Sequence, residues 1–193
     1  LNSFEEIIKF GNDVSWPIVV KPLSSSGSQG VTYVENEKAS HGAFNEVNKF
    51  SKNGSFIAEK YIFGTHHDIN GLMWDGEFYE CGIADRFFTN LPYFVPDYGH
   101  YPSKISKKLK KSFYKMLKDG AKSMNLNWGP IKADGLVSED KCFIYEITPR
   151  FHGDIVTSIS MSFLRETNPI YQFFKKIYDN KHSFLNPNHN TNN

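Results

Sequence analysis

The segment that most constrains the fold is a strand, a serine- and glycine-rich loop and a second strand, which together occupy residues 17–31. Val19 and Val20 are β-branched and indicate a buried strand, and Lys21 lies where that strand ends. Small hydroxyl residues and glycines follow, and their backbone can turn tightly and direct its N–H groups into one concavity. With a lysine ammonium beside it, such a loop suits the phosphates of a nucleoside triphosphate.

An ordinary β-hairpin with a polar loop is the alternative interpretation of this segment, because such hairpins are common. Two known phosphate motifs do not match it. In a Walker A loop the lysine follows the glycines and opens a helix, whereas Lys21 precedes them and a strand follows. The dinucleotide fingerprint also requires a helix next.

Length and composition favour one domain or two small lobes, long enough to bury a core. The chain has 193 residues, and its 22 Lys and Arg nearly balance its 21 Asp and Glu, so its net charge favours neither nucleic acid nor a membrane as a partner. Cys81 and Cys142 are the only cysteines, which predicts free thiols in the reducing cytoplasm. No membrane span or signal peptide is indicated.

Hydrophobic spacing and turn residues predict a small α+β lobe followed by a larger lobe. The first lobe is expected to hold helices over residues 3–10 and 37–50 and strands over residues 18–21, 30–34 and 55–61. The second is expected to hold two hairpins, over residues 67–85 and 130–147, and a helix over residues 106–125 with a lysine-rich solvated face and an apolar stripe that includes Met124. A long aromatic loop is expected over residues 87–102, and helix and loop over residues 155–178.

Acidic residues and an arginine gather on the second of these hairpins. Antiparallel pairing can bring Asp134 and Glu146 onto one face, where two carboxylates repel each other unless a cation or a proton lies between them. Their hard oxygens suit Mg²⁺, and Arg150 could clamp a carboxylate or a phosphate. The alternative is that Asp134 is a turn residue and that Glu146 and Arg150 form a structural ion pair.

The segment at residues 57–64 leaves a strand and turns at Gly64. Its exposed backbone could hydrogen-bond a flat heterocycle, or it could be a plain strand end with a surface ion pair. Taken in chain order, the notable motifs are Val-Val-Lys-Pro with Ser-Ser-Gly-Ser-Gln-Gly-Val, Glu-Lys-Tyr-Ile-Phe-Gly, Asn70-Gly71, Asp85-Arg86, Gly129-Pro130 with Lys132-Ala133-Asp134, and Glu146-Ile147-Thr148-Pro149-Arg150.

This ordered set resembles the ATP-grasp superfamily, on its carboxylate–amine ligase side, over about residues 3–153. Each motif is weak alone, and their order and spacing make the set specific. The resemblance implies an α+β ATP-grasp fold with two lobes, each with an antiparallel sheet and helices, and ATP between them. Residues 1–62 would form the flap lobe, residues 63–182 the metal-binding lobe and residues 183–193 a disordered tail.

The resemblance also implies roles for individual residues. The ATP contacts would come from Lys21, the flap residues Ser25, Ser26, Gly27, Ser28, Gln29 and Gly30, the hinge residues Glu59, Lys60, Tyr61 and Ile62, and His66. Asp134, Glu146 and Thr148 would hold Mg²⁺, for which Mn²⁺ is a plausible substitute, and Arg150 and Arg86 would face the reacting groups.

Two positions depart from the family pattern. His66 stands where the family often has a glutamate for the ribose hydroxyls, and Thr148 stands where it often has an asparagine. Because a hydroxyl is a poorer metal ligand, a second Mg²⁺ is expected to bind weakly.

The implied reaction is ATP-dependent ligation, in which a small-molecule acid becomes an acyl phosphate that an amine, or a thiol, then attacks. An N-terminal substrate domain of the same protein would complete the site. The alternatives are an ATP-grasp kinase and a catalytically silent nucleotide-binding module.

Overall fold

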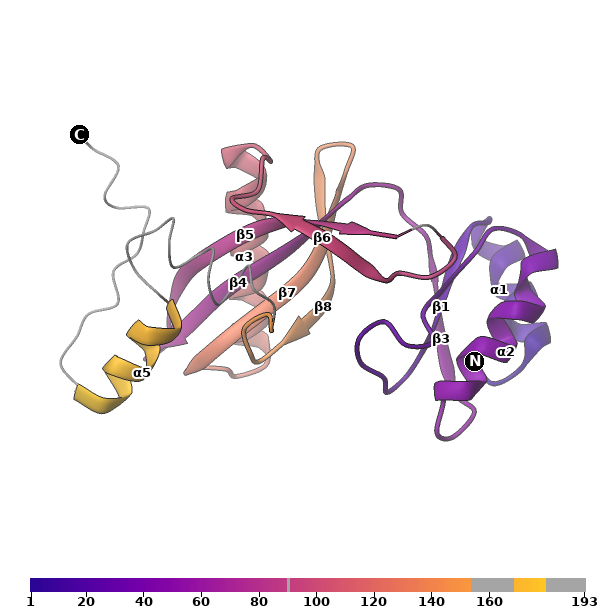
Figure 1. The fold of residues 1–193 in the computed structure, drawn as a ribbon, viewed down its shortest axis with the longest axis horizontal. Coiled ribbons are helices and arrows are strands. Elements are labelled where there is room, and N and C mark those ends of the chain that lie inside the picture. The colour runs from indigo at the N-terminus through magenta and orange to yellow at the C-terminus, as the bar shows by residue number, and fades with distance from the viewer. Residues whose placement is uncertain (90, 154–168, 180–193) are drawn as a thin grey trace. The chain divides into compact units, whose positions relative to one another are not determined.

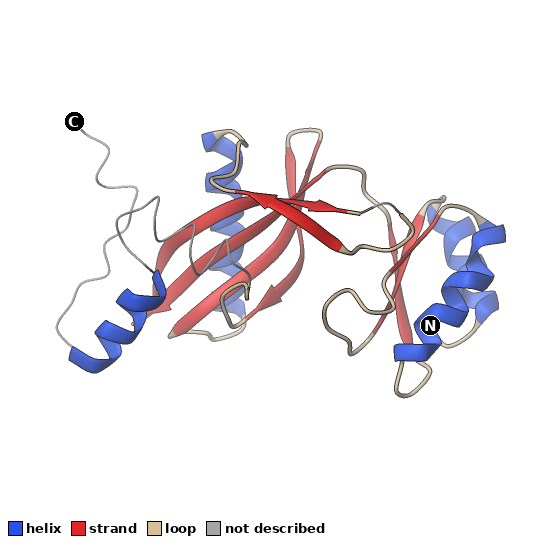
Figure 2. Cartoon of the chain, viewed as in Figure 1, coloured by secondary structure: helices blue, strands red, loops and turns tan. Residues whose placement is uncertain are grey.

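The computed structural model describes residues 1–89, 91–153 and 169–179 of the chain. The chain divides into two compact units, one made of Leu1–Phe63 and Phe87–Tyr98 and the other of Gly64–Arg86 and Gly99–Asn193. Figure 1 shows the elements in chain order, and Figure 2 shows the helices and strands that make up each unit. Among the described helices, none combines the length and the apolar character that crossing a bilayer requires.

The first unit is a three-stranded antiparallel sheet with helices on one face. Its strands are β1 (Ile18–Pro22), β2 (Thr32–Val34) and β3 (Phe56–Lys60), in the order β2-β1-β3. The helices are α1 (Phe4–Val14) and α2 (Ser40–Phe50), with the short 3₁₀ helix η1 (Glu37–Ala39) before α2. The side chains of Ser3 and Glu6 form a capping box at the start of α1, which satisfies two N–H groups that the helix leaves unpaired.

Alternation along β1 decides which of its side chains enter the core. Ile18 and Val20 are fully buried against the two helices, whereas Val19 and Lys21 point to the opposite face. The buried cluster consists of Ile7, Ile18, Val20, Val34, Ala43, Val47 and Phe56. Lys21 is therefore placed on the face of the sheet that the helices leave uncovered.

The serine- and glycine-rich loop joins β1 to β2, as the sequence predicts. Gly27, Ser28 and Gly30 have φ values of 64°, 61° and 77°, so the chain turns through the left-handed region at three positions. The hydroxyl of Ser25 donates to the carbonyl of Gln29 at 2.8 Å and closes the loop on itself. Residues 23–27 are exposed.

The second unit contains a five-stranded antiparallel sheet with the order β6-β5-β4-β7-β8. The strands are β4 (Thr65–Trp74), β5 (Glu77–Phe88), β6 (Pro96–His100), β7 (Gly129–Ser138) and β8 (Lys141–Thr148). Among the described residues, the helices α3 (Lys107–Ser123) and α5 (Pro169–Asp179) accompany them. Tight turns join β4 to β5 and β7 to β8, with positive φ at Asp75, Gly76, Glu139 and Asp140.

The two faces of this sheet have opposite character because successive side chains of a strand point to opposite sides. One face packs against α3 in a buried cluster of Ile69, Met73, Ile83, Phe113, Tyr114, Leu117, Ala121, Ile131 and Ala133. The residues that alternate with these on β4 and β7, such as Asp68, Asn70, Lys132 and Asp134, point to the other face. On that face Leu72 and Trp74 pack against Phe173 of α5.

Three predictions from the sequence are corrected by these elements. The expected loop at residues 87–102 is wrong in part, because β5 extends to Phe88 and an edge strand, β6, lies within the segment. Pro96 and Pro102 argued against a strand here, because proline is found in sheets only at edge strands and at strand ends. Met124 caps α3 and is 48% exposed, so it does not extend the apolar stripe. Residues 37–39 form a separate 3₁₀ turn. The predictions for residues 155–168 and 183–193 lie outside the described residues.

Replacing Gly30 with alanine is expected to destabilise the first unit more than the same change at Gly27. A Cβ atom at Gly30 would lie 2.8 Å from Pro22 and 2.9 Å from Phe50, whereas at Gly27 it would meet no neighbour within 4 Å. Both positions have positive φ, which costs about 1 kcal/mol for alanine. We expect Gly30→Ala to lose about 1–3 kcal/mol more than Gly27→Ala by urea denaturation, and equal losses would contradict the packing argument.

Candidate functional site

Three carboxylates lie in a row across the polar face of the second unit's sheet. Asp134 on β7 is the register partner of Asp68 on β4 and of Glu146 on β8. The prediction that antiparallel pairing brings Asp134 and Glu146 onto one face is thus confirmed, and the alternative that Asp134 is a turn residue is wrong. Three facing carboxylates require positive charge between them.

Lys132 supplies that charge between Asp134 and Glu146. It precedes Asp134 by two residues on β7, so both side chains point to the same face. Its Nζ atom lies 2.6 Å from Asp134 Oδ2 and 2.7 Å from Glu146 Oε1, and its side chain is only 4% exposed. Thr148, the register partner of Lys132, donates its hydroxyl to Glu146 Oε1 at 2.9 Å.

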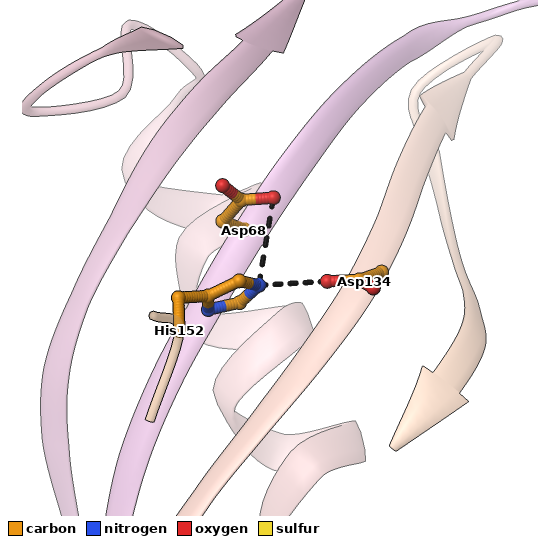
Figure 3. Close-up of side chains that lie close together, drawn as sticks. All are labelled: Asp68, Asp134 and His152. Atoms are coloured by element: carbon orange, nitrogen blue, oxygen red, sulfur yellow. Dashed lines mark hydrogen bonds and ion pairs between the residues drawn. The ribbon is translucent and has the colours of Figure 1, made fainter. Parts of the chain in front are cut away.

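Asp68 binds Arg86, and it shares the neighbour His152 with Asp134. Arg86 on β5 donates from Nε to Asp68 Oδ2 at 2.8 Å, and its Nη2 binds the same oxygen. The ring of His152 lies beside both acids, with Nε2 at 2.7 Å from Asp134 Oδ1 and 3.5 Å from Asp68 Oδ1 (Figure 3). One ligand atom from each of Asp68, Asp134 and His152 lies within 4.8 Å of the others, a spacing that could hold a metal ion.

These neighbours set the charge state of Asp134. Burial acts to raise the pKa of its carboxyl group, but the hydrogen bond and charge of His152, together with Lys132, outweigh burial and hold the pKa below its usual value. Asp134 is therefore an anion over the whole neutral range. An anionic oxygen ligand is what a hard divalent cation requires.

Asn70 orients His152. The backbone N–H of His152 donates to Asn70 Oδ1 at 3.1 Å, which fixes this oxygen as an acceptor, and Nδ1 of the ring lies 3.0 Å from the same atom. Both ring nitrogens thus face oxygen atoms. The Nδ2 atom of Asn70 is buried and has no hydrogen-bond partner within the described part of the chain.

A β-bulge brings Tyr145 to the same region. Asp134 pairs with Glu146, whereas the next residue, Gly135, pairs with Ile144, so Tyr145 is the extra residue of the bulge. Its hydroxyl is hydrogen-bonded to Nδ1 of His66 at 3.2 Å. Burial and the nearby carboxylates of Asp134 and Asp68 raise the pKa of Tyr145 far above its usual value, so its hydroxyl keeps its proton. Burial lowers the pKa of His66.

The predicted ATP contacts in the first unit have their own partners. Nζ of Lys21 lies 2.7 Å from Glu59 Oε2 across the β1–β3 pair, and both side chains remain partly exposed. The backbone N–H of Tyr61 donates to Pro17, and its ring packs against Tyr33. Lys60 is exposed and Ile62 is half-buried. The exposed loop and the partly exposed lysine leave this region open to a ligand.

Arg150 lies apart from the ion pairs of the polar face. Its guanidinium donates to the carbonyl of Phe151 at 3.0 Å, and the side chain is exposed. The alternative that Glu146 and Arg150 form a structural ion pair is wrong, because Glu146 is paired with Lys132 instead.

Sequence reasoning missed Asp68, Asn70, Lys132 and His152 as members of this site. A signal existed for the first three, since polar residues alternate with Ile69, Ile131 and Ala133 along two buried strands. Polar residues at every second position of an otherwise apolar strand indicate a polar face. His152 follows β8, and the sequence does not show that the chain returns over Asn70.

A family model described as an ATP-grasp domain matches residues 14–158, and this chain belongs to that family. Among curated proteins it is similar to the alanine–anticapsin ligase of Bacillus subtilis, with 26% identity over 110 residues that cover 44% of this chain and 23% of the relative. It is also similar to the carbamoyl phosphate synthase large chain of Agathobacter rectalis, with 21% identity over 147 residues that cover 76% of this chain and 14% of the relative.

Solved structures confirm the ATP-grasp fold. Biotin carboxylase from Campylobacter jejuni has a TM-score of 0.78 at 18% identity and covers 96% of this chain and 42% of its own. An L-amino acid ligase from Bacillus licheniformis has a TM-score of 0.71 at 20% identity and covers 84% of this chain and 39% of its own. The chain thus spans about a quarter or less of these two curated relatives and about two fifths of these structures.

His67, on the α3 side of the sheet, is expected to make folding sensitive to acid. It is 2% exposed, and its Nδ1–H donates to Asp85 at 3.0 Å while Nε2 accepts from Thr65. Burial lowers its pKa below 6.5 despite Asp85. The unfolded chain therefore takes up a proton that the folded chain resists, and stability falls as the pH drops below that value.

The test measures the free energy of unfolding at about pH 7.5 and at about pH 5.5, and the difference between the two values is the loss of stability. We expect His67→Gln to reduce this loss, with part of it remaining because burial also lowers the pKa of His66. His41→Gln, at an exposed position of α2, serves as the control and should show the wild-type loss. An unchanged loss in His67→Gln would remove His67 as the cause.

Proposed function

We propose that this chain is the Mg-ATP-binding part of a ligase that converts a small-molecule acid into an acyl phosphate and joins it to an amine. The observation that carries the proposal is the row of Asp68, Asp134 and Glu146, with Lys132, Arg86 and His152 among them, in a chain of the ATP-grasp family. Phosphoryl transfer needs charge neutralisation and positioning more than covalent chemistry by the protein, and this face offers both.

The donor set fits Mg²⁺. Asp134 and Glu146 are register partners with carboxylate oxygens on one face, and Thr148 adds a hydroxyl beside Glu146. Glu146 is half-exposed, which leaves room for phosphate and water in the ion's shell. Of two similar structures, one is described as a complex with MgADP and the other as a β-γ-ATP complex. When bound, Mg²⁺ would neutralise the charge of the transferring phosphate.

The residues of the chain would then act as follows. We propose that Lys21 and the N–H groups of the loop contact the phosphates, while the backbone of residues 59–62 binds adenine and His66 a ribose hydroxyl. Arg150 and Arg86 would hold the acid and the transferring phosphate through their planar forks. Closure of the loop over the phosphates would exclude the water that hydrolyses an acyl phosphate.

The bond changes of the reaction balance without any further reagent. A carboxylate oxygen of the acid attacks the γ-phosphorus, and the bond to the bridging oxygen breaks as ADP leaves. The amine nitrogen then attacks the acyl carbon, phosphate leaves with its electron pair, and the nitrogen loses a proton. We propose that a further domain of the same protein contributes to the substrate site, and that the protein works in the cytoplasm, where its two free thiols stay reduced.

The test of this function is phosphate release by the intact protein with Mg-ATP and pairs of candidate acids and amines. The names of two relatives, alanine–anticapsin ligase and L-amino acid ligase, make amino acids the first candidates. Release that requires both an acid and an amine supports the ligase. Phosphorylation of an alcohol would establish a kinase instead, and nucleotide binding without any turnover would establish a silent module.

Glu146→Gln is expected to lower turnover by at least about a hundredfold, because it removes an anionic metal ligand. The change keeps the size of the side chain and should spare the fold, which a thermal melt checks. Glu77→Gln, an exposed position at the start of β5 in the same sheet, should retain wild-type turnover. Unchanged turnover in Glu146→Gln would exclude this residue from the site.

Lys21→Ala is expected to weaken nucleotide binding by about tenfold or more, because a charge-assisted phosphate contact is lost. Isothermal titration of the intact protein with Mg-ATP measures this. Lys49→Ala is the matched control, since Lys49 belongs to the same unit, is mostly exposed and pairs with Glu46 as Lys21 pairs with Glu59. Equal affinities for the two variants would count against a phosphate contact from Lys21.

A further inference from the structure

The ammonium group of Lys132 lies where a cation bridging Asp134 and Glu146 would lie. Its distances of 2.6 Å and 2.7 Å place it between one oxygen of each carboxylate. A magnesium ion that bridged the same two oxygens would need both of them within about 2.1 Å. An ammonium and a divalent cation cannot share this position, because like charges at such a distance repel strongly in a partly buried site.

The other oxygens of the two carboxylates are not equivalent. Asp134 Oδ1 accepts from His152 at 2.7 Å, and Glu146 Oε1 already accepts from both Lys132 and Thr148. Glu146 Oε2 has no ion-pair or hydrogen-bond partner among the described residues, and its side chain is 52% exposed. One divalent cation can therefore bind at the open oxygen of Glu146 without displacing Lys132.

We propose that Lys132 is a built-in cation that fills the bridging position, so that this site takes one divalent metal ion with its nucleotide and not two. The proposal rests on the proposed function, which supplies the nucleotide. Lys132 is thus a positioning residue, since it acts through the two carboxylates. Its burial supports the role, because a 4% exposed lysine held by two acids on adjacent strands has little freedom to leave.

Counting bound Mn²⁺ by electron paramagnetic resonance tests the proposal in two arms. In the first arm the intact protein is titrated with Mn²⁺ alone. Lys132→Met, which keeps the length of the side chain and removes its charge, should bind Mn²⁺ more than about tenfold tighter than the wild type, because the competing ammonium is gone. Equal affinities in the two proteins would overturn the proposal.

In the second arm a non-hydrolysable ATP analogue is added at saturation. The wild type should bind one Mn²⁺ tightly per nucleotide and Lys132→Met two. Two tightly bound ions in the wild type would overturn the proposal even if the variant fails to fold. In that case a metal ion, and not Lys132, would occupy the bridging position between the carboxylates.

Two further variants separate charge from structure. Lys132→Arg keeps a cation between the carboxylates and should retain one Mn²⁺ per nucleotide, an outcome that a purely structural role for the lysine does not predict. Lys115→Met is the matched control, because Lys115 pairs with Asp119 on the exposed face of α3 and should leave both arms at wild-type values. Failure of the wild type to bind the nucleotide would reject the proposed function, while the first arm still decides the role of Lys132.

Discussion

The arrangement of the second unit depends on the balance of charge across three adjacent strands. Asp68, Asp134 and Glu146 occupy one register line on β4, β7 and β8, and unpaired they would repel one another. Lys132 lies between Asp134 and Glu146. His152 lies beside Asp68 and Asp134. Arg86 donates two hydrogen bonds to Asp68. Since an uncompensated charge in a partly buried site costs several kcal/mol, each acid depends on its cation and the six side chains form one interdependent network.

The same strands that carry this network also build the core, and the pleat separates the two tasks. On β4, His67, Ile69 and Met73 point toward α3, whereas Asp68 and Asn70 point to the polar face. The apolar cluster under α3 therefore fixes the strands whose opposite faces hold the acids. Charge chemistry on one face relies on hydrocarbon packing on the other, because only a rigid sheet keeps the carboxylates within reach of a single cation.

Local features of this chain were predictable from the sequence, and contacts between distant segments were largely not. The Asp75-Gly76 turn, the loop after Lys21 and the pairing of Asp134 with Glu146 follow from turn chemistry and alternation, which are short-range rules. The bulge at Tyr145 and the return of His152 over Asn70 depend on register and on chain path, and no residue pattern nearby encodes either. The strand β6 was missed because it begins with Pro96, and proline is tolerated at the edge of a sheet.

The departure from the family pattern at Thr148 lies directly beside Lys132. A hydroxyl binds a divalent ion more weakly than an amide carbonyl, and Thr148 donates its proton to Glu146. Thr148 is also the register partner of Lys132, so the weaker ligand and the competing ammonium stand side by side on β7 and β8. If the ammonium of Lys132 fills the bridging position, a strong ligand for a second metal ion is not required at position 148. The threonine is therefore consistent with working single-ion chemistry, and it is poor evidence that the site has lost catalysis.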